Sequence, residues 1–84
     1  MTIYTLTEKI DTAKRLCGKL EEETKTFVCV RFEDGESGYW ELEVRDAVNI
    51  DKVIYNKEFE TIDELTDWVI GLWTGAMIAN RKDI

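Results

Sequence analysis

Few side chains in this 84-residue sequence could serve as a nucleophile, a general base or a metal ligand. The chain has two cysteines, Cys17 and Cys29, and no histidine. A cysteine nucleophile works as a thiolate, which needs a nearby base or an electropositive setting, and neither is expected at these positions. Two cysteines without paired spacing, and without histidine, do not make a zinc site. We therefore predict no catalytic residue, no metal ligand and no cofactor, and a protein that is not an enzyme.

Glu41 and Glu43 are the best-placed pair of carboxylates for acid–base chemistry. They alternate with apolar residues in the segment Tyr39–Arg45, which predicts a strand that carries both on one face, about 6.7 Å apart. Acid–base catalysis by a carboxylate needs a pocket that withdraws it from water, and a flat sheet face offers none. Two like charges within a Debye length of about 8 Å repel each other. We therefore expect a basic partner, rather than a substrate, to relieve the repulsion between Glu41 and Glu43.

Negative charge is concentrated in the middle of the chain. The net charge at pH 7 is −7, and residues 32–67 alone hold twelve acidic and three basic side chains, a net charge of −9. A surface of this kind repels phosphate and attracts basic proteins. We therefore expect a basic protein as the partner, and no direct binding to nucleic acid or to an anionic membrane.

The sequence carries no signal for export or for membrane insertion. No apolar run reaches the ~18 residues of a membrane span. The opening segment MTIYTLTEK lacks the basic and apolar regions of a secretory signal. Two cysteines are also too few for a disulfide framework. We expect a cytoplasmic protein whose thiols are reduced and lie in the core.

Hydrophobic spacing predicts two helices and three strands. Residues 5–23, and the segment that begins at Thr61, each carry an apolar stripe that advances by three and four residues in turn. Thr5 with Glu8, and Thr61 with Glu64, fit the capping pattern of a helix start. The segments predicted as strands, rich in β-branched and aromatic residues, are Thr26–Phe32, Tyr39–Arg45 and Lys52–Phe59.

The element order α-β-β-β-α predicts one α+β domain over residues 1–84. Consecutive strands joined by short turns, such as residues 34–38, should form a three-stranded antiparallel meander with the second strand in the middle. Both helices should pack on the apolar face of this sheet. That face should hold Val28, Val30, Trp40, Leu42 and Val44. The facing of the third strand stays open, because Val53, Tyr55 and Phe59 compete with Ile54.

The opposite face of the sheet should be left uncovered. By alternation it should hold Phe27, Cys29, Arg31, Tyr39, Glu41, Glu43 and Arg45. Antiparallel sheets often leave one face in water, so an ordinary solvated face is one interpretation. Acids placed around aromatic residues are also typical of protein-binding surfaces, and this is the other interpretation.

A short, acidic, non-enzymatic domain with this element order resembles the small phage-encoded inhibitors of host defence. These include anti-CRISPR proteins and anti-restriction DNA mimics. The resemblance covers length, composition and element order over the whole chain, and it carries over no functional residue. It implies an inhibitor that occupies the basic nucleic-acid groove of an effector such as a CRISPR nuclease.

The residues themselves favour the same function. Carboxylates arrayed on a stiff sheet can stand in for phosphates in a groove lined with lysine and arginine, and charge steering would make association fast and salt-sensitive. We predict that the protein binds a basic nucleic-acid-handling protein and blocks its nucleic-acid site. The predicted partner-binding residues are the phosphate-like acids Glu33, Asp34, Glu36, Glu41, Glu43 and Asp46, with Tyr39 as a packing anchor.

Two other functions also fit the sequence. One is a structural or assembly module that forms a homodimer through Trp68, Trp73 and Met77, which widen the apolar arc of the second helix beyond one face. The other is an immunity protein or antitoxin that pairs with a basic toxin. It would use the same acidic surface, so the sequence leaves this alternative open.

Overall fold

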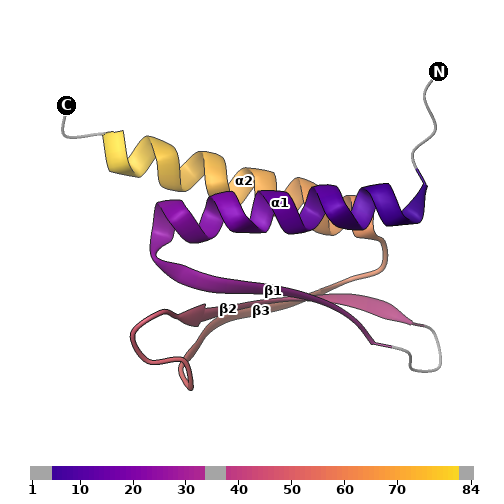
Figure 1. Ribbon diagram of the computed structural model, residues 1–84, viewed down its shortest axis with the longest axis horizontal. Helices are drawn as coiled ribbons and strands as arrows, with labels where there is room; N and C mark the ends of the chain where they lie inside the picture. Colours follow the sequence, from indigo (N-terminus) through magenta and orange to yellow (C-terminus); the bar gives the residue numbers. More distant parts are fainter. Residues whose placement is uncertain (1–4, 34–37, 82–84) are drawn as a thin grey trace.

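Two helices lie side by side on one face of a three-stranded sheet (Figure 1). The computed structural model describes residues 5–33 and 38–81. In chain order the elements are α1 (Leu6–Thr24), β1 (Thr26–Glu33), β2 (Tyr39–Asp46), β3 (Val53–Phe59) and α2 (Ile62–Arg81). The predicted α+β architecture, with the order α-β-β-β-α and both helices on one face, is confirmed.

The sheet is an antiparallel meander in the order β1-β2-β3, so the central position of β2 is as predicted. Its register settles the facing of the third strand. Trp40 lies opposite Phe59 and Val44 lies opposite Tyr55, which places Phe59 and Tyr55 on the side of the helices. An irregularity between Val44 and Arg45 then shifts the register of β3 by one residue. Such a bulge explains why simple alternation could not place the start of this strand.

The core lies between the helix layer and the inner face of the sheet. Each helix contributes three buried residues, and the sheet adds four. The buried apolar set is Ala13, Cys17, Leu20, Val28, Leu42, Val44, Phe59, Ile62, Leu65 and Val69. All three buried residues of α2 lie in its first half, so its second half packs less deeply.

Side-chain caps fix where both helices begin. The Thr5 hydroxyl accepts a hydrogen bond from the Glu8 backbone N–H at 3.2 Å, and the Thr61 hydroxyl accepts one from the Glu64 backbone N–H at 3.2 Å. Each cap satisfies one of the free N–H groups of a first helical turn. The helix starts predicted at Thr5 and Thr61 are therefore confirmed.

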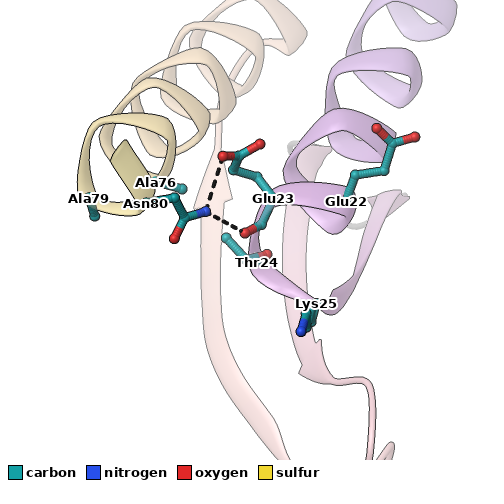
Figure 2. Close-up of a pocket in the computed structure, with 7 residues that line it drawn as sticks. All are labelled: Glu22, Glu23, Thr24, Lys25, Ala76, Ala79 and Asn80. Atoms are coloured by element: carbon teal, nitrogen blue, oxygen red, sulfur yellow. Dashed lines mark hydrogen bonds between the residues drawn. The ribbon is translucent and has the colours of Figure 1, made fainter. Parts of the chain in front are cut away.

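Polar contacts fix the ends of both helices. Lys25 follows α1 with a left-handed backbone (φ 55°) and turns the chain into β1. Glu21 then accepts a hydrogen bond from the Val28 backbone N–H at 3.0 Å, which joins the end of α1 to β1. Asn80 of α2 donates to the backbone carbonyl of Glu23 at 2.9 Å and to its carboxylate at 3.0 Å (Figure 2). These contacts tie α1 to β1 and to the second half of α2.

Neither described helix combines the length and the apolar character that a bilayer crossing requires.

Truncation of Leu65 should show how much stability this packing supplies. Leu65 is fully buried between α2 and the rest of the core, so Leu65→Ala should lower the free energy of unfolding by about 2–5 kcal/mol. The control Leu6→Ala removes a side chain that is 58% exposed and should change stability by about 0.5 kcal/mol or less. Urea unfolding followed by circular dichroism measures both. Equal losses in the two variants would contradict the described core.

Candidate functional site

The bare face of the sheet is the part of the molecule that the sequence assigned to partner binding. Cross-strand pairs on this face match Phe27 with Arg45, Cys29 with Glu43, Arg31 with Glu41, and Glu33 with Tyr39. On the other side of β2, Glu41 lies opposite Glu58, and Glu43 lies opposite Asn56. The face is therefore mixed, with two arginines among its acids.

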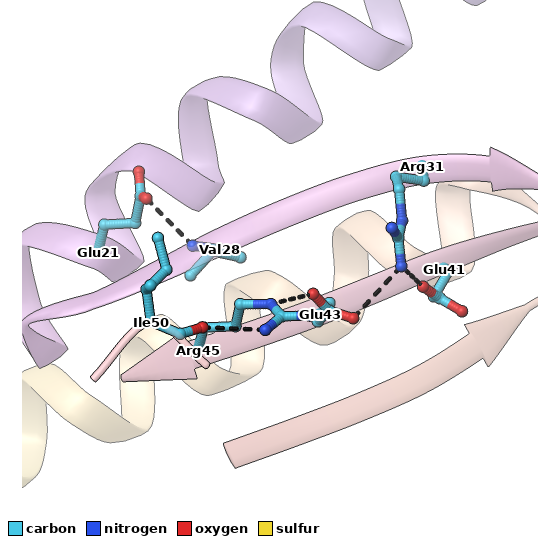
Figure 3. Close-up of polar contacts among 7 residues, drawn as sticks. All are labelled: Glu21, Val28, Arg31, Glu41, Glu43, Arg45 and Ile50. Atoms are coloured by element: carbon cyan, nitrogen blue, oxygen red, sulfur yellow. Dashed lines mark hydrogen bonds and ion pairs between the residues drawn. The ribbon is translucent and has the colours of Figure 1, made fainter. Parts of the chain in front are cut away.

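These two arginines bind the central acids of the face (Figure 3). The guanidinium of Arg31 donates to Glu41 and, at 3.3 Å, to Glu43. Arg45 donates from its Nε to Glu43 and from its terminal nitrogen to the Ile50 carbonyl at 2.9 Å. As a result only 10% of the Glu43 side chain is exposed, although neither α1 nor α2 covers this face.

The expectation that Glu41 and Glu43 present uncompensated negative charge is therefore wrong. Strand alternation places Arg31 directly opposite Glu41, and Arg45 two residues beyond Glu43 on the same face. The hydrogen bond from Arg45 holds the pKa of Glu43 below its ordinary value and outweighs the desolvation that would raise it. The chain's own cations thus relieve the repulsion that sequence reasoning left for a partner.

Asp46 stabilises the turn between β2 and β3. Its carboxylate accepts hydrogen bonds from the backbone N–H groups of Val48 at 2.7 Å and of Asn49 at 3.1 Å. These two bonds lower the pKa of Asp46. Asp46 lies half-buried at the far end of β2 from Tyr39, so the structure does not bring these two predicted contacts together. The predicted contacts Asp34 and Glu36 lie outside the described residues.

A second group of acids lies at the β1–β2 hairpin end of the sheet, and we call it the acidic rim. It consists of Glu33, Glu58 and Glu60 around Tyr39. Glu33 is the cross-strand partner of Tyr39, while Glu58 and Glu60 line one hollow together with Tyr39. Glu58 and Glu60 are exposed, and Glu33 and Tyr39 are half-buried. Within residues 5–33 and 38–81, none of the three acids forms an ion pair with a lysine or arginine.

The Tyr39 hydroxyl reports how closely these acids surround it. Its pKa is raised above the ordinary value of a tyrosine, first by desolvation and then by the charges of Glu58, Glu33 and Glu41. The phenol therefore stays neutral and keeps its proton for donation. Carboxylates that accept hydrogen bonds beside an aromatic ring suit a lysine or arginine side chain of a partner.

Sequence reasoning included Glu33 and Tyr39 but missed Glu58 and Glu60. The facing of β3 would have indicated Glu58, since Phe59 on the helix side requires Glu58 on the bare side. The bulge that obscures this facing lies at the other end of β3, opposite Val44 and Arg45 of β2. Strand alternation counted back from Phe59 therefore predicts Glu58 on the bare face.

The two cysteines lie in different settings. Cys17 is buried in the core, and burial raises the pKa of its thiol to about 12, so it stays protonated and unreactive near neutral pH. Cys29 is exposed on the bare face opposite Glu43, so the expectation that both thiols lie in the core is wrong for Cys29. In the described part of the chain, no three Cys, Asp or Glu side chains gather as a metal site would require.

Two further hollows lie beside the helix layer. One is lined by Glu22, Glu23, Lys25, Asn80 and neighbouring residues, and its polar groups include the clamp between Asn80 and Glu23 (Figure 2). The other is a groove of about 250 Å³ between the two helices and the sheet, lined mostly by apolar groups that include Leu20, Ile54 and Leu72.

A pH experiment tests the ion pairs of Glu43. Because the pKa of Glu43 is lower in the folded protein than in the unfolded chain, its contribution to stability is present above the unfolded value of about 4.5 and is lost as the pH falls through the folded value. Glu43→Gln should therefore flatten the decline of the free energy of unfolding between about pH 5 and 3. Urea unfolding at several pH values measures it. An unchanged slope would show that Arg31 and Arg45 do not hold this carboxylate.

The titration of Tyr39 tests the acidic rim. Glu58→Gln removes the largest charge acting on the phenol, so the pKa of Tyr39 should fall towards 10. The control Glu64→Gln changes net charge equally on α2 and should leave this pKa unchanged. Carbon-13 NMR of labelled tyrosine rings, assigned with Tyr39→Phe, gives the value. A pKa of Tyr39 that ignores Glu58 would remove that acid from the rim.

Comparison with protein-family models, with curated proteins and with solved structures gives no match.

Proposed function

We propose that this protein is a non-enzymatic inhibitor that binds a basic nucleic-acid-handling protein and blocks its nucleic-acid site. The acidic rim is the proposed contact surface, in place of the centre of the sheet. More specifically, we propose an anti-CRISPR or DNA-mimic inhibitor encoded by a phage, because the chain resembles such inhibitors in length, composition and element order. Its target would be an effector such as a CRISPR nuclease in the cytoplasm.

One observation carries the proposal: exposed acids of the rim have no cation of their own chain within ion-pair distance in the described residues. Glu58 lies directly opposite Glu41 on the neighbouring strand, where like charges destabilise a sheet. Arg31 is already bonded to Glu41 and Glu43. A lysine or arginine from a partner would therefore relieve repulsion that the fold leaves in place.

The sheet holds the acids at this end on a regular framework. Neighbouring strands lie about 4.8 Å apart, and side chains on one face of a strand repeat about every 6.7 Å. Carboxylates held on such a framework can stand in for the phosphates of a nucleic acid in a basic groove. The sequence continues from Glu33 into Asp34 and Glu36, which extends the run of acids along the chain.

A charge-reversal comparison tests the proposal. The variant Glu58→Lys/Glu60→Lys reverses two rim acids, and the control Asp11→Lys/Glu22→Lys reverses two exposed acids of α1, so both change net charge by the same amount. Parent and variants are immobilised and exposed to a nuclease-treated bacterial lysate, and retained proteins are eluted with a salt gradient. The retained protein is then purified for rate measurements. We expect the rim variant to lower its association rate about tenfold or more, and the control to lower it much less.

A competition assay completes the test. A fluorescently labelled oligonucleotide that the retained protein binds should be displaced by the parent chain and not by the rim variant. Equal retention on the rim variant and the control would contradict the rim as contact surface. A retained toxin whose bound nucleic acid is not displaced would favour the immunity or antitoxin function instead.

A further inference from the structure

The outer face of α2 carries an apolar stripe that the described chain covers at one end only, where Trp68 packs on Phe59 and Lys57 lies over its ring. Trp68, Gly71, Gly75 and Ile78 follow each other at steps of three, four and three residues, the spacing of a coiled-coil seam. Trp68 is 42% exposed and Ile78 is 66% exposed, and both glycines between them are exposed. The core-facing stripe of the same helix is separate, since its buried residues are Ile62, Leu65 and Val69. The helix thus has a second apolar face, most of which the described chain leaves open.

Open space surrounds the middle of this stripe. A Cβ atom added at Gly71 or at Gly75 would meet no atom within 4 Å. Each glycine weakens a helix by about 1 kcal/mol relative to alanine, and the packing of the single chain does not require either one. Small residues at this spacing allow a second helix to approach closely.

The charges of α2 indicate which partner fits this stripe, namely a second copy of the same helix. Exposed Glu64 lies in its first turn and exposed Arg81 in its last, while Asp63 of the first turn is already paired with Lys9 of α1 at 3.1 Å. Glu64 thus makes one end of the outer face acidic, and Arg81 makes the other end basic. Two such helices packed antiparallel place each Arg81 beside the acidic end of the other, and their dipoles also oppose favourably. A two-fold axis midway between Gly71 and Gly75 sets Trp68 against Ile78 of the other helix. It also sets Gly71 against Gly75, which leaves room for close contact.

We propose that the outer face of α2, formed by Trp68, Gly71, Gly75 and Ile78, is an antiparallel two-fold interface with a second copy of this chain. The seam differs from the dimer surface predicted from the sequence, of which it keeps only Trp68. Trp73 is half-buried against the core with Lys19 over its ring, and Met77 is also half-buried.

The seam is the surface of a single helix, which predicts a modest dimer. A standard interface takes about 800 Å² from each partner. The seam and the acidic rim adjoin at a hollow that Trp68 and Glu58 line together. Gly71, Gly75 and Ile78 are not among the residues of that hollow, so the dimer does not depend on the proposed function.

Sedimentation equilibrium tests the seam. The parent chain should be a dimer at about 500 μM and dissociate towards about 5 μM, as expected of a small interface. Gly75→Gln should stay monomeric over this range, and its melting temperature should not fall, because glutamine favours helix and meets open space. The control Gly18→Gln adds the same side chain on α1, also into open space, and should still dimerise.

A charge swap tests the antiparallel arrangement. Arg81→Glu should weaken the dimer at low salt by about tenfold, and Arg81→Glu/Glu64→Arg should restore it. These residues lie about 25 Å apart along one helix, so rescue can come only from contact between two chains. A parent chain that is monomeric at the highest concentration, a Gly75→Gln variant that dimerises like the parent, or a swap without rescue would each overturn the proposal.

Discussion

The hydrogen-bonded ion pairs that Arg31 and Arg45 make with Glu41 and Glu43 decide what the bare face of the sheet can offer a partner. Because both helices pack on one side of the sheet, the acids of the opposite face depend on cations of that same face for neutralisation. A carboxylate with as little exposure as Glu43 is tolerated only when it is paired and hydrogen-bonded. The pairs of Arg31 therefore join β1 to β2, and all these pairs together remove two acids from the charge available to a partner. Among the acids described around this face, those of the acidic rim remain without an ion pair.

The fold followed closely from the sequence because its signals agree with one another. The stripe that includes Ala13 and Cys17 predicted the buried face of α1, and the threonine caps predicted both helix starts. Only the register of β3 could not be predicted. A bulge adds one residue to β3, which alternation does not anticipate. Its position, opposite Val44 and Arg45, depends on how β3 pairs with β2.

The candidate site followed less well, because it depends on which side chains find each other across strands. Alternation correctly put Glu43 and Arg45 on one face, yet whether they pair depends on rotamers and on the opposite strand, which supplies Arg31. Sequence reasoning counted charges over a segment, and a sum cannot separate compensated acids from free ones. For Cys29 two sequence arguments disagreed, since composition assigned its thiol to the core and alternation placed it on the bare face, where it lies in the structure.

The most direct test maps where a cationic probe binds. A short oligolysine peptide is titrated into the nitrogen-15-labelled protein, and amide shifts are followed by NMR at low and high salt. The largest shifts should fall at Glu33, Tyr39, Glu58 and Glu60, and they should disappear at high salt. Shifts centred on Glu41 and Glu43, or spread evenly over the acids of both helices, would contradict the claim that the chain neutralises its sheet centre and leaves the rim free.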